Sequence, residues 1–111
     1  MGKVLGLIAG SGRLPFEVAL GAQASGLELA IAAIEDNTDP EIEKLATAGA
    51  LWIAAGELGR LLEFLKSAGA SEVILAGAVA RREMFRDPAR LRPDARAIAL
   101  LSPRNWRIRT A

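Results

Sequence analysis

The feature that most constrains this 111-residue sequence is a series of four nearly continuous apolar runs with helix-like segments between them. The runs are Val4 to Ala9, Leu29 to Ile34, Ala50 to Ala55 and Val73 to Ala76. Runs that are apolar throughout, rather than alternating, are typical of parallel strands covered on both faces. Because parallel strands need a long crossover connection, usually a helix, the sequence predicts strands and helices in alternation.

The segments between the runs carry helix signals. Residues 15–25 begin with a proline and should face inward through Phe16, Ala19 and Leu20, and Asp39 with Pro40 marks the N-cap and first residue of a second helix. A third segment carries leucines at i, i+3, i+4 and i+7: Leu58, Leu61, Leu62 and Leu65. Glycines suited to a left-handed residue after a helix follow the three segments: Gly26, Gly49 and Gly69. We predict an α/β fold, a Rossmann-like three-layer domain with a parallel sheet of four or five strands.

Composition excludes several kinds of chemistry. The sequence has no Cys and no His, which removes disulfides, thiolate metal sites and the commonest general base. No apolar run approaches the roughly 18 residues that cross a bilayer, and the N-terminus lacks the layout of a signal peptide. The sequence therefore predicts a cytoplasmic protein with at most peripheral membrane contact.

Charge divides the chain unevenly. Residues 1–80 hold five Lys/Arg and ten Asp/Glu, whereas residues 81–111 hold nine Arg and three acids. The basic end, with Trp106 between Arg104 and Arg107, could stack on nucleic acid, but it lacks any motif spacing, so we predict no nucleic-acid partner. We expect one domain over residues 1–101 and an irregular tail over residues 102–111.

Ligands of open parallel sheets bind outside the carboxyl ends of the strands. The first strand leads into a glycine turn and a helix N-terminus, where backbone N–H groups and the helix dipole favour a phosphate. Glycines also follow the third and fourth strands, although a glycine there can simply permit a sharp turn. Arginines nearby could add positive charge. The candidate substrate-binding residues are Gly10, Ser11, Gly12, Arg13, Leu14, Gly56, Glu57, Gly77, Val79 and Arg81.

A dinucleotide site is the main alternative. Gly10 and Gly12 supply two of the three glycines of the dinucleotide fingerprint, and Glu35 or Asp36 stands where a ribose-binding acid belongs. Pro15 replaces the third glycine, which adds bulk and removes one N–H, so this alternative is weaker.

The carboxylates do not form a convincing acid–base pair. Glu57, Glu41 and Glu43 open helices, where the dipole stabilises an acid. Glu35 with Asp36 and Asp39 could attract a divalent cation, but acids on one loop are more often solvated turn residues. We therefore predict no catalytic residue and no metal ligand in this chain.

Four blocks of the sequence resemble, in order and spacing, the family of LpxI-type UDP-2,3-diacylglucosamine diphosphatases of bacterial lipid A synthesis. They are Gly6 to Pro15, Gly56 to Gly69, Val73 to Arg81 and Leu91 to Arg96. The similarity runs from about residue 4 to residue 101 and ends at Ser102. Ala78 and Arg82 depart from the family pattern and put the phosphate contact and the linker in doubt.

The resemblance implies a two-domain enzyme that uses Mg²⁺ to hydrolyse the diphosphate of UDP-2,3-diacylglucosamine to UMP and lipid X. It also implies a cytoplasmic location with at most peripheral contact with the inner membrane. In that family the ligand lies between a Rossmann-like N-terminal domain and a C-terminal domain with the metal-associated aspartate. This chain would be the N-terminal domain alone, binding UDP-2,3-diacylglucosamine or lipid X without Mg²⁺ and without activity. Apolar surface around Trp52 could support a homo-oligomer. A dinucleotide-binding or regulatory module, or an interaction domain without a small ligand, are the other hypotheses.

Overall fold

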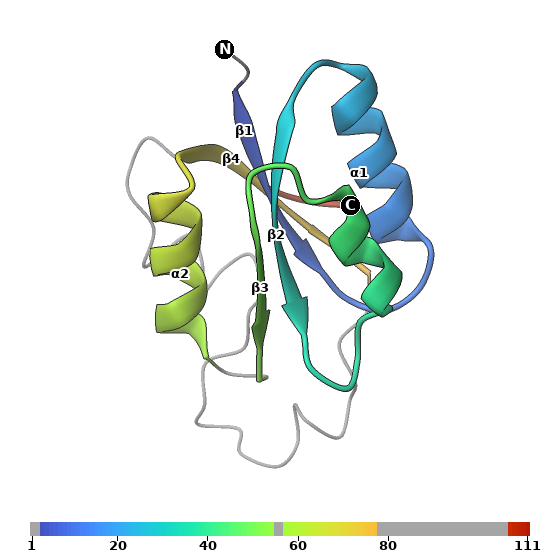
Figure 1. The fold of residues 1–111 in the computed structure, drawn as a ribbon, viewed down its shortest axis with the longest axis vertical. Coiled ribbons are helices and arrows are strands. Elements are labelled where there is room, and N and C mark those ends of the chain that lie inside the picture. The colour runs from blue at the N-terminus through green and yellow to red at the C-terminus, as the bar shows by residue number, and fades with distance from the viewer. Residues whose placement is uncertain (1–2, 55–56, 78–106) are drawn as a thin grey trace.

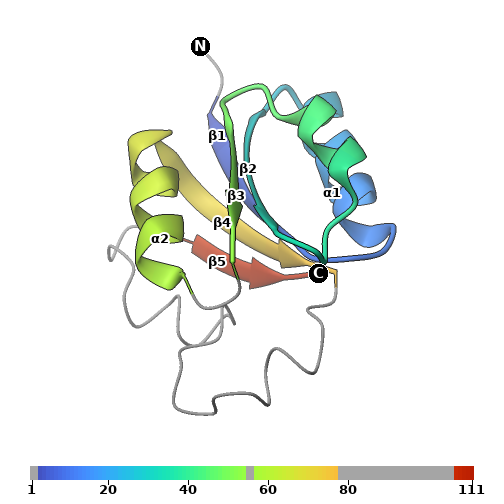
Figure 2. The same ribbon diagram turned by 60° about the horizontal axis from the view of Figure 1, so that its bottom comes forward.

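A computed structural model describes residues 3–54, 57–77 and 107–111 of the chain. In chain order the elements are β1 (Val4–Ala9), α1 (Leu14–Ala24), β2 (Glu28–Ile34), the 3₁₀ helix η1 (Pro40–Leu45), β3 (Ala50–Ile53), α2 (Leu58–Ser67), β4 (Ala70–Ala76) and β5 (Arg107–Thr110). The strands form one sheet in the order β3-β2-β1-β4-β5, and every neighbouring pair is parallel. Figures 1 and 2 show α2 on one face and α1 with η1 on the other. The predicted three-layer α/β fold with a parallel sheet is confirmed.

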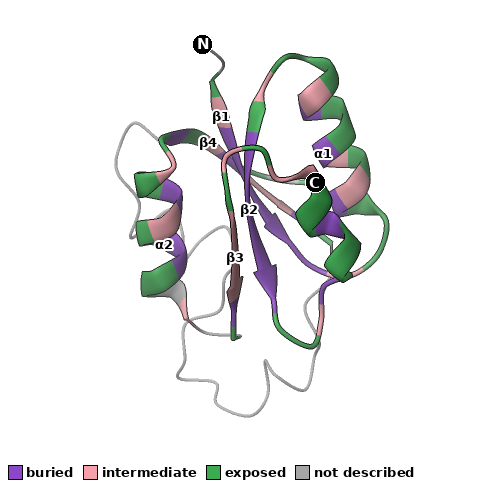
Figure 3. Ribbon diagram, in the orientation of Figure 1, coloured by how far each residue is buried: buried purple, intermediate pink, exposed green. Residues whose placement is uncertain are grey.

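The apolar runs become strands because the sheet buries both of their faces. β1 is the central strand, and Leu7 pairs with Ile31 of β2 and Ile74 of β4. Residues 5–9 and 29–34 are buried without interruption (Figure 3). Alternate side chains of β1 therefore enter different cores, Ile8 on the α2 side and Leu7 on the α1 side.

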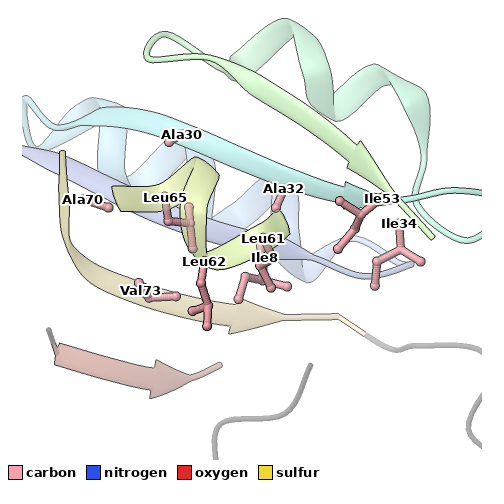
Figure 4. Close-up of a cluster of buried hydrophobic side chains, with 10 residues drawn as sticks. All are labelled: Ile8, Ala30, Ala32, Ile34, Ile53, Leu61, Leu62, Leu65, Ala70 and Val73. Carbon is pink, nitrogen blue, oxygen red and sulfur yellow. The ribbon is translucent and has the colours of Figure 1, made fainter. Parts of the chain in front are cut away.

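The leucine stripe of α2 packs as the spacing predicts. Leu61, Leu62 and Leu65 are buried in a cluster with residues of β1, β2, β3 and β4 (Figure 4). Its other members are Ile8, Ala30, Ala32, Ile34, Ile53, Ala70 and Val73. On the other face, Ile42 of η1 joins the core with Ala19 and Ala22 of α1.

Two details of the helices differ from the expectation. Leu20 is 55% exposed, because α1 faces the sheet through Pro15, Ala19 and Ala22, which are spaced at i, i+4 and i+7. The segment after Pro40 begins at its predicted N-cap, Asp39, but forms a 3₁₀ helix. Among the described residues, no helix is both long enough and apolar enough to cross a bilayer.

The prediction of an irregular tail over residues 102–111 was wrong for its last part. Arg107–Thr110 form β5, with Ile108 paired to Val73 and packed against the α2-side core. Arg109 forms an ion pair with Glu72 of β4. An edge strand needs few inward side chains, so Arg-Ile-Arg-Thr carries only one apolar residue and gave no strand signal.

Candidate functional site

The carboxyl ends of β1 and β4 define the candidate site. From β1 the chain continues to β2 and β3, toward one edge of the sheet. It then returns to β4 and β5, toward the other edge. The order of strands therefore reverses between β1 and β4, and ligands of open α/β sheets bind at such a reversal. The glycine turn after β1 and Gly77 after β4 both lie at this place.

The turn after β1 is hydrogen-bonded to the sheet at its first residue and exposed at its later residues. The Gly10 backbone N–H donates to the Ala76 carbonyl at 2.8 Å, which joins the turn to the end of β4. Gly12 is exposed with φ +93°, and no atom of the described residues lies within 4 Å of the place where a side chain would begin. Arg13 and Leu14 are exposed, and within the described ranges the N-cap residue Arg13 makes no side-chain capping bond to the start of α1. The positive end of the helix dipole is thus accessible beside this turn.

Gly77 packs directly against the turn after β1. A Cβ atom at this position would lie 2.5 Å from the Ser11 carbonyl oxygen and 2.9 Å from the Gly10 carbonyl carbon and from Pro15 Cγ. Its φ of +91° also favours glycine. The structure therefore brings together Gly10, Ser11 and Gly77 of the predicted site, and it gives Gly77 a packing role there.

The turn after β2 contributes a residue that sequence reasoning missed. Thr38 is 7% exposed, and its hydroxyl accepts from the Ile34 N–H at 3.0 Å and donates to the Ala9 carbonyl at 2.6 Å. Its signal in the sequence is weak, because a Thr among acidic turn residues is ordinarily solvated. Asp36 in the same turn adopts φ +60° and is exposed.

The acidic side chains described in this turn are not arranged as metal ligands. Glu35, Asp36 and Asp39 are exposed, and Asp39 caps η1 by accepting from the Glu41 N–H at 2.9 Å. Over residues 3–54, 57–77 and 107–111, no three His, Cys, Asp or Glu side chains gather as metal ligands would. The described residues therefore do not fit Mg²⁺, and no step through a metal follows from them.

Glu57 closes the connection between β3 and α2. Its Oε1 accepts from the Ala54 N–H at 2.7 Å, and Arg60 forms an ion pair with the carboxylate at 3.1 Å. The Ala54 hydrogen bond, and then the bond and charge of Arg60, lower the pKa of the Glu57 carboxyl below its ordinary value. These contacts give Glu57 a role within its own turn. Three other predicted site residues, Gly56, Val79 and Arg81, lie outside the described residues.

We expect Glu57→Gln to lower the melting temperature at pH 7 and to have a smaller effect at pH 3. Because the carboxyl pKa is lowered on folding, its contribution exists above the unfolded-state pKa and is lost as pH falls through the folded-state pKa. The glutamine Oε1 can still accept from Ala54, so the variant removes the charge and the second acceptor oxygen that faces Arg60. Thermal melts of both proteins at the two pH values measure this. An equal difference at pH 3 and pH 7 would contradict the prediction.

The geometry of the turn after β1 suits the binding of an anion. It combines an open glycine turn, an uncapped helix start and an exposed Arg13.

Comparison with known proteins gives two findings. The family model described as the LpxI N-terminal domain matches residues 4–109. A protein of Caulobacter vibrioides named UDP-2,3-diacylglucosamine pyrophosphatase LpxI is 34% identical over 99 residues, which are 89% of this chain and 33% of that protein. The chain thus spans about a third of the length of this relative. The family match also includes residues 102–109, where the sequence analysis placed the end of the similarity.

Proposed function

The chain belongs to the LpxI N-terminal domain family, and from this premise we propose that it is the substrate-binding domain of a UDP-2,3-diacylglucosamine diphosphatase. The activity in the relative's name is that of a protein three times as long, so for this chain it is a proposal. The observation that carries the proposal is the open glycine turn at the uncapped start of α1. Its ligand would be the diphosphate of UDP-2,3-diacylglucosamine or the phosphate of lipid X.

The physical case rests on charge. A helix N-terminus presents about half a positive charge and stabilises an anion by roughly 0.3–1 kcal/mol when exposed. Arg13 adds a guanidinium beside the same turn, and its fork of donors matches phosphate oxygens. Leu14, 37% exposed at the first residue of α1, supplies apolar surface next to these groups for the acylated part of the ligand. Trp52 is partly buried against the α1-side core, so it offers less surface for self-association than its sequence position implied.

Binding and hydrolysis place different demands on the protein. Hydrolysis of a phosphoanhydride needs a charge clamp, such as a metal ion, and a positioned water. The described ranges supply the anion-binding turn and bring no metal-ligand group together. We therefore propose that the described part of this chain contributes ligand binding to the reaction.

A dinucleotide-binding module remains the second candidate, because Glu35 and Asp36 are exposed at the carboxyl end of β2. Pro15 weighs against it. This residue is fully buried and contacts the Gly77 position, so it fills the space that the third fingerprint glycine leaves open.

Native mass spectrometry of the purified chain with UDP-2,3-diacylglucosamine, lipid X, UMP and NAD tests the proposal. We expect uptake of the uridine lipid or lipid X by the wild type and its loss in Gly12→Trp, whose indole would cover the turn. Gly26→Trp is the matched control. It has a similar φ of +81° and open space but lies at the other end of α1, so it should retain uptake. Uptake of NAD alone would contradict the proposal and favour the dinucleotide module.

A further inference from the structure

The turn after β2 is hydrogen-bonded to the carboxyl end of β1. The ladder between β1 and β2 begins with the Glu28 N–H donating to the Lys3 carbonyl at 2.9 Å, and its register pairs each β1 residue with the β2 residue 24 positions later, up to Ala9 with Ala33. At this end of the ladder the Thr38 hydroxyl bonds to both strands, 3.0 Å from the Ile34 nitrogen and 2.6 Å from the Ala9 oxygen.

Each strand also keeps its other neighbour at this level. The Glu35 N–H donates to the Ile53 carbonyl at 2.8 Å, so β2 stays paired with β3. On the other side of β1, the bond from Gly10 to Ala76 at 2.8 Å joins it to β4. The Thr38 hydroxyl is thus bonded to the sheet at Ala9, immediately before the glycine turn.

The hydroxyl of Thr38 has a fixed orientation in this place. A hydroxyl carries one proton and two acceptor lone pairs. Because the Ile34 N–H already donates to it, its own proton goes to the Ala9 carbonyl. Both partners are thereby satisfied in a buried position, where an unpaired backbone group is costly.

The side chain is not needed to close its own turn. The Thr38 N–H donates to the Ile34 carbonyl at 3.0 Å, and the Asn37 N–H donates to the same carbonyl at 3.1 Å. What the hydroxyl adds is a bond to Ala9, 29 residues earlier in the chain. The bond thus links the turn after β2 to the first residue that sets the path of the glycine turn.

We propose that Thr38 is a positioning residue of the anion-binding turn. Its hydroxyl bonds to the carboxyl ends of both β1 and β2 and fixes the Ala9 carbonyl, from which the chain enters Gly10 to Arg13. Where it concerns ligand affinity, this inference rests on the proposed function. The geometry of the turn can be measured without any ligand.

The test compares Thr38→Val, which keeps the shape without the hydroxyl, with Thr38→Ser, which keeps the hydroxyl. Residue-specific amide hydrogen exchange by NMR on the full chain reports the opening of the turn. We expect exchange at Gly10 and Ser11 to rise by about tenfold in Thr38→Val, because one buried hydrogen-bond link is lost, and by less than about threefold in Thr38→Ser. If the valine variant does not fold, Thr38→Cys replaces it. The rise in exchange should then lie between those expected for serine and valine, since a thiol forms weaker hydrogen bonds than a hydroxyl but a methyl group forms none.

Ile42→Val is the control for a general loss of stability. Ile42 is fully buried in the connection that follows Thr38, and none of the bonds at Ala9 or Ile34 involves it. Conditions are chosen so that all variants are more than about 99% folded, which needs roughly 3 kcal/mol of remaining stability. If Gly10 and Ser11 exchange no faster in Thr38→Val than in Ile42→Val, the positioning role is overturned.

Affinity for lipid X and UMP is measured in parallel by titration. We expect Thr38→Val to raise Kd by about tenfold, with Thr38→Ser and Ile42→Val near the wild type, because a misplaced turn weakens the bonds it makes to an anion. If Kd is unchanged in a variant whose turn exchanges faster, the proposed effect of Thr38 on ligand affinity is overturned. A wild type that binds neither probe would contradict the proposed function, while the exchange data would still decide the geometry.

Discussion

Gly77→Ala should lower the free energy of unfolding by about 3 kcal/mol, from roughly 1 kcal/mol of left-handed backbone strain and about 2 kcal/mol of overpacking. The added methyl would meet the Ser11 carbonyl oxygen at 2.5 Å, and backbone cannot move aside as a flexible side chain can. The melting temperature of a domain of this size should fall by at least about 10 °C. Urea denaturation and thermal melts measure both quantities.

Gly69→Ala separates the two causes of this loss. Gly69 has a similar φ of +83°, but in the described part of the chain no atom lies within 4 Å of the place where its side chain would begin. It should cost only the backbone strain, about 1 kcal/mol. Equal losses at the two positions would show that the turns after β1 and β4 are not packed as described. Because Gly77→Ala also displaces Gly10 and Ser11, we expect it to reduce lipid X uptake at a temperature where it is folded.

Leu65→Ala should destabilise the domain by about 3 kcal/mol, because it opens a cavity beneath α2. Leu65 is fully buried in the cluster shown in Figure 4. Its Cδ2 atom lies 2.9 Å from the place where a Cβ of Gly6 would be. Gly6→Ala alone should therefore cost about 1–2 kcal/mol through overpacking. Denaturant titrations of the single variants give both values.

The double variant of Gly6→Ala and Leu65→Ala should recover part of the loss, since the new methyl enters the space that the leucine leaves. We expect its destabilisation to be at least about 1 kcal/mol smaller than the sum of the single effects. Leu61→Ala provides the control, because Leu61 is equally buried in the same cluster but is not among the nearest atoms to Gly6. A cycle with Leu61 should be close to additive, and similar coupling in both cycles would refute the packing of Gly6 against Leu65.

Local pattern was sufficient for most of the fold. The four apolar runs predicted β1 to β4 because a strand covered on both faces has no polar side. The leucines of α2 predicted its buried face, since apolar residues at i, i+3 and i+4 share one side of a helix. Leu20 was misplaced because α1 is apolar on several sides, so periodicity could not select the face that packs.

The candidate site could be located from the sequence but not built from it. Gly10 and Gly12 marked the turn, because a strand that leads into glycines and a helix start predicts an anion site. The sequence did not distinguish Gly12, which is open, from Gly77, which is packed against backbone. Nor did it indicate that the Glu57 carboxylate is engaged by Ala54 and Arg60.

The sequence by itself thus determined the α/β class, the parallel strands, the glycine turn and the family. Each of these features depends on residues that are close together in the chain. Only the tertiary structure decided β5, the hydrogen bonds of Thr38 and the packing of Gly77. These depend on contacts between Arg109 and Glu72, Thr38 and Ala9, and Gly77 and Ser11. The two residues of each pair are dozens of positions apart in the chain. They are brought together by hydrogen bonding and close packing, which leave no periodic signal in the sequence.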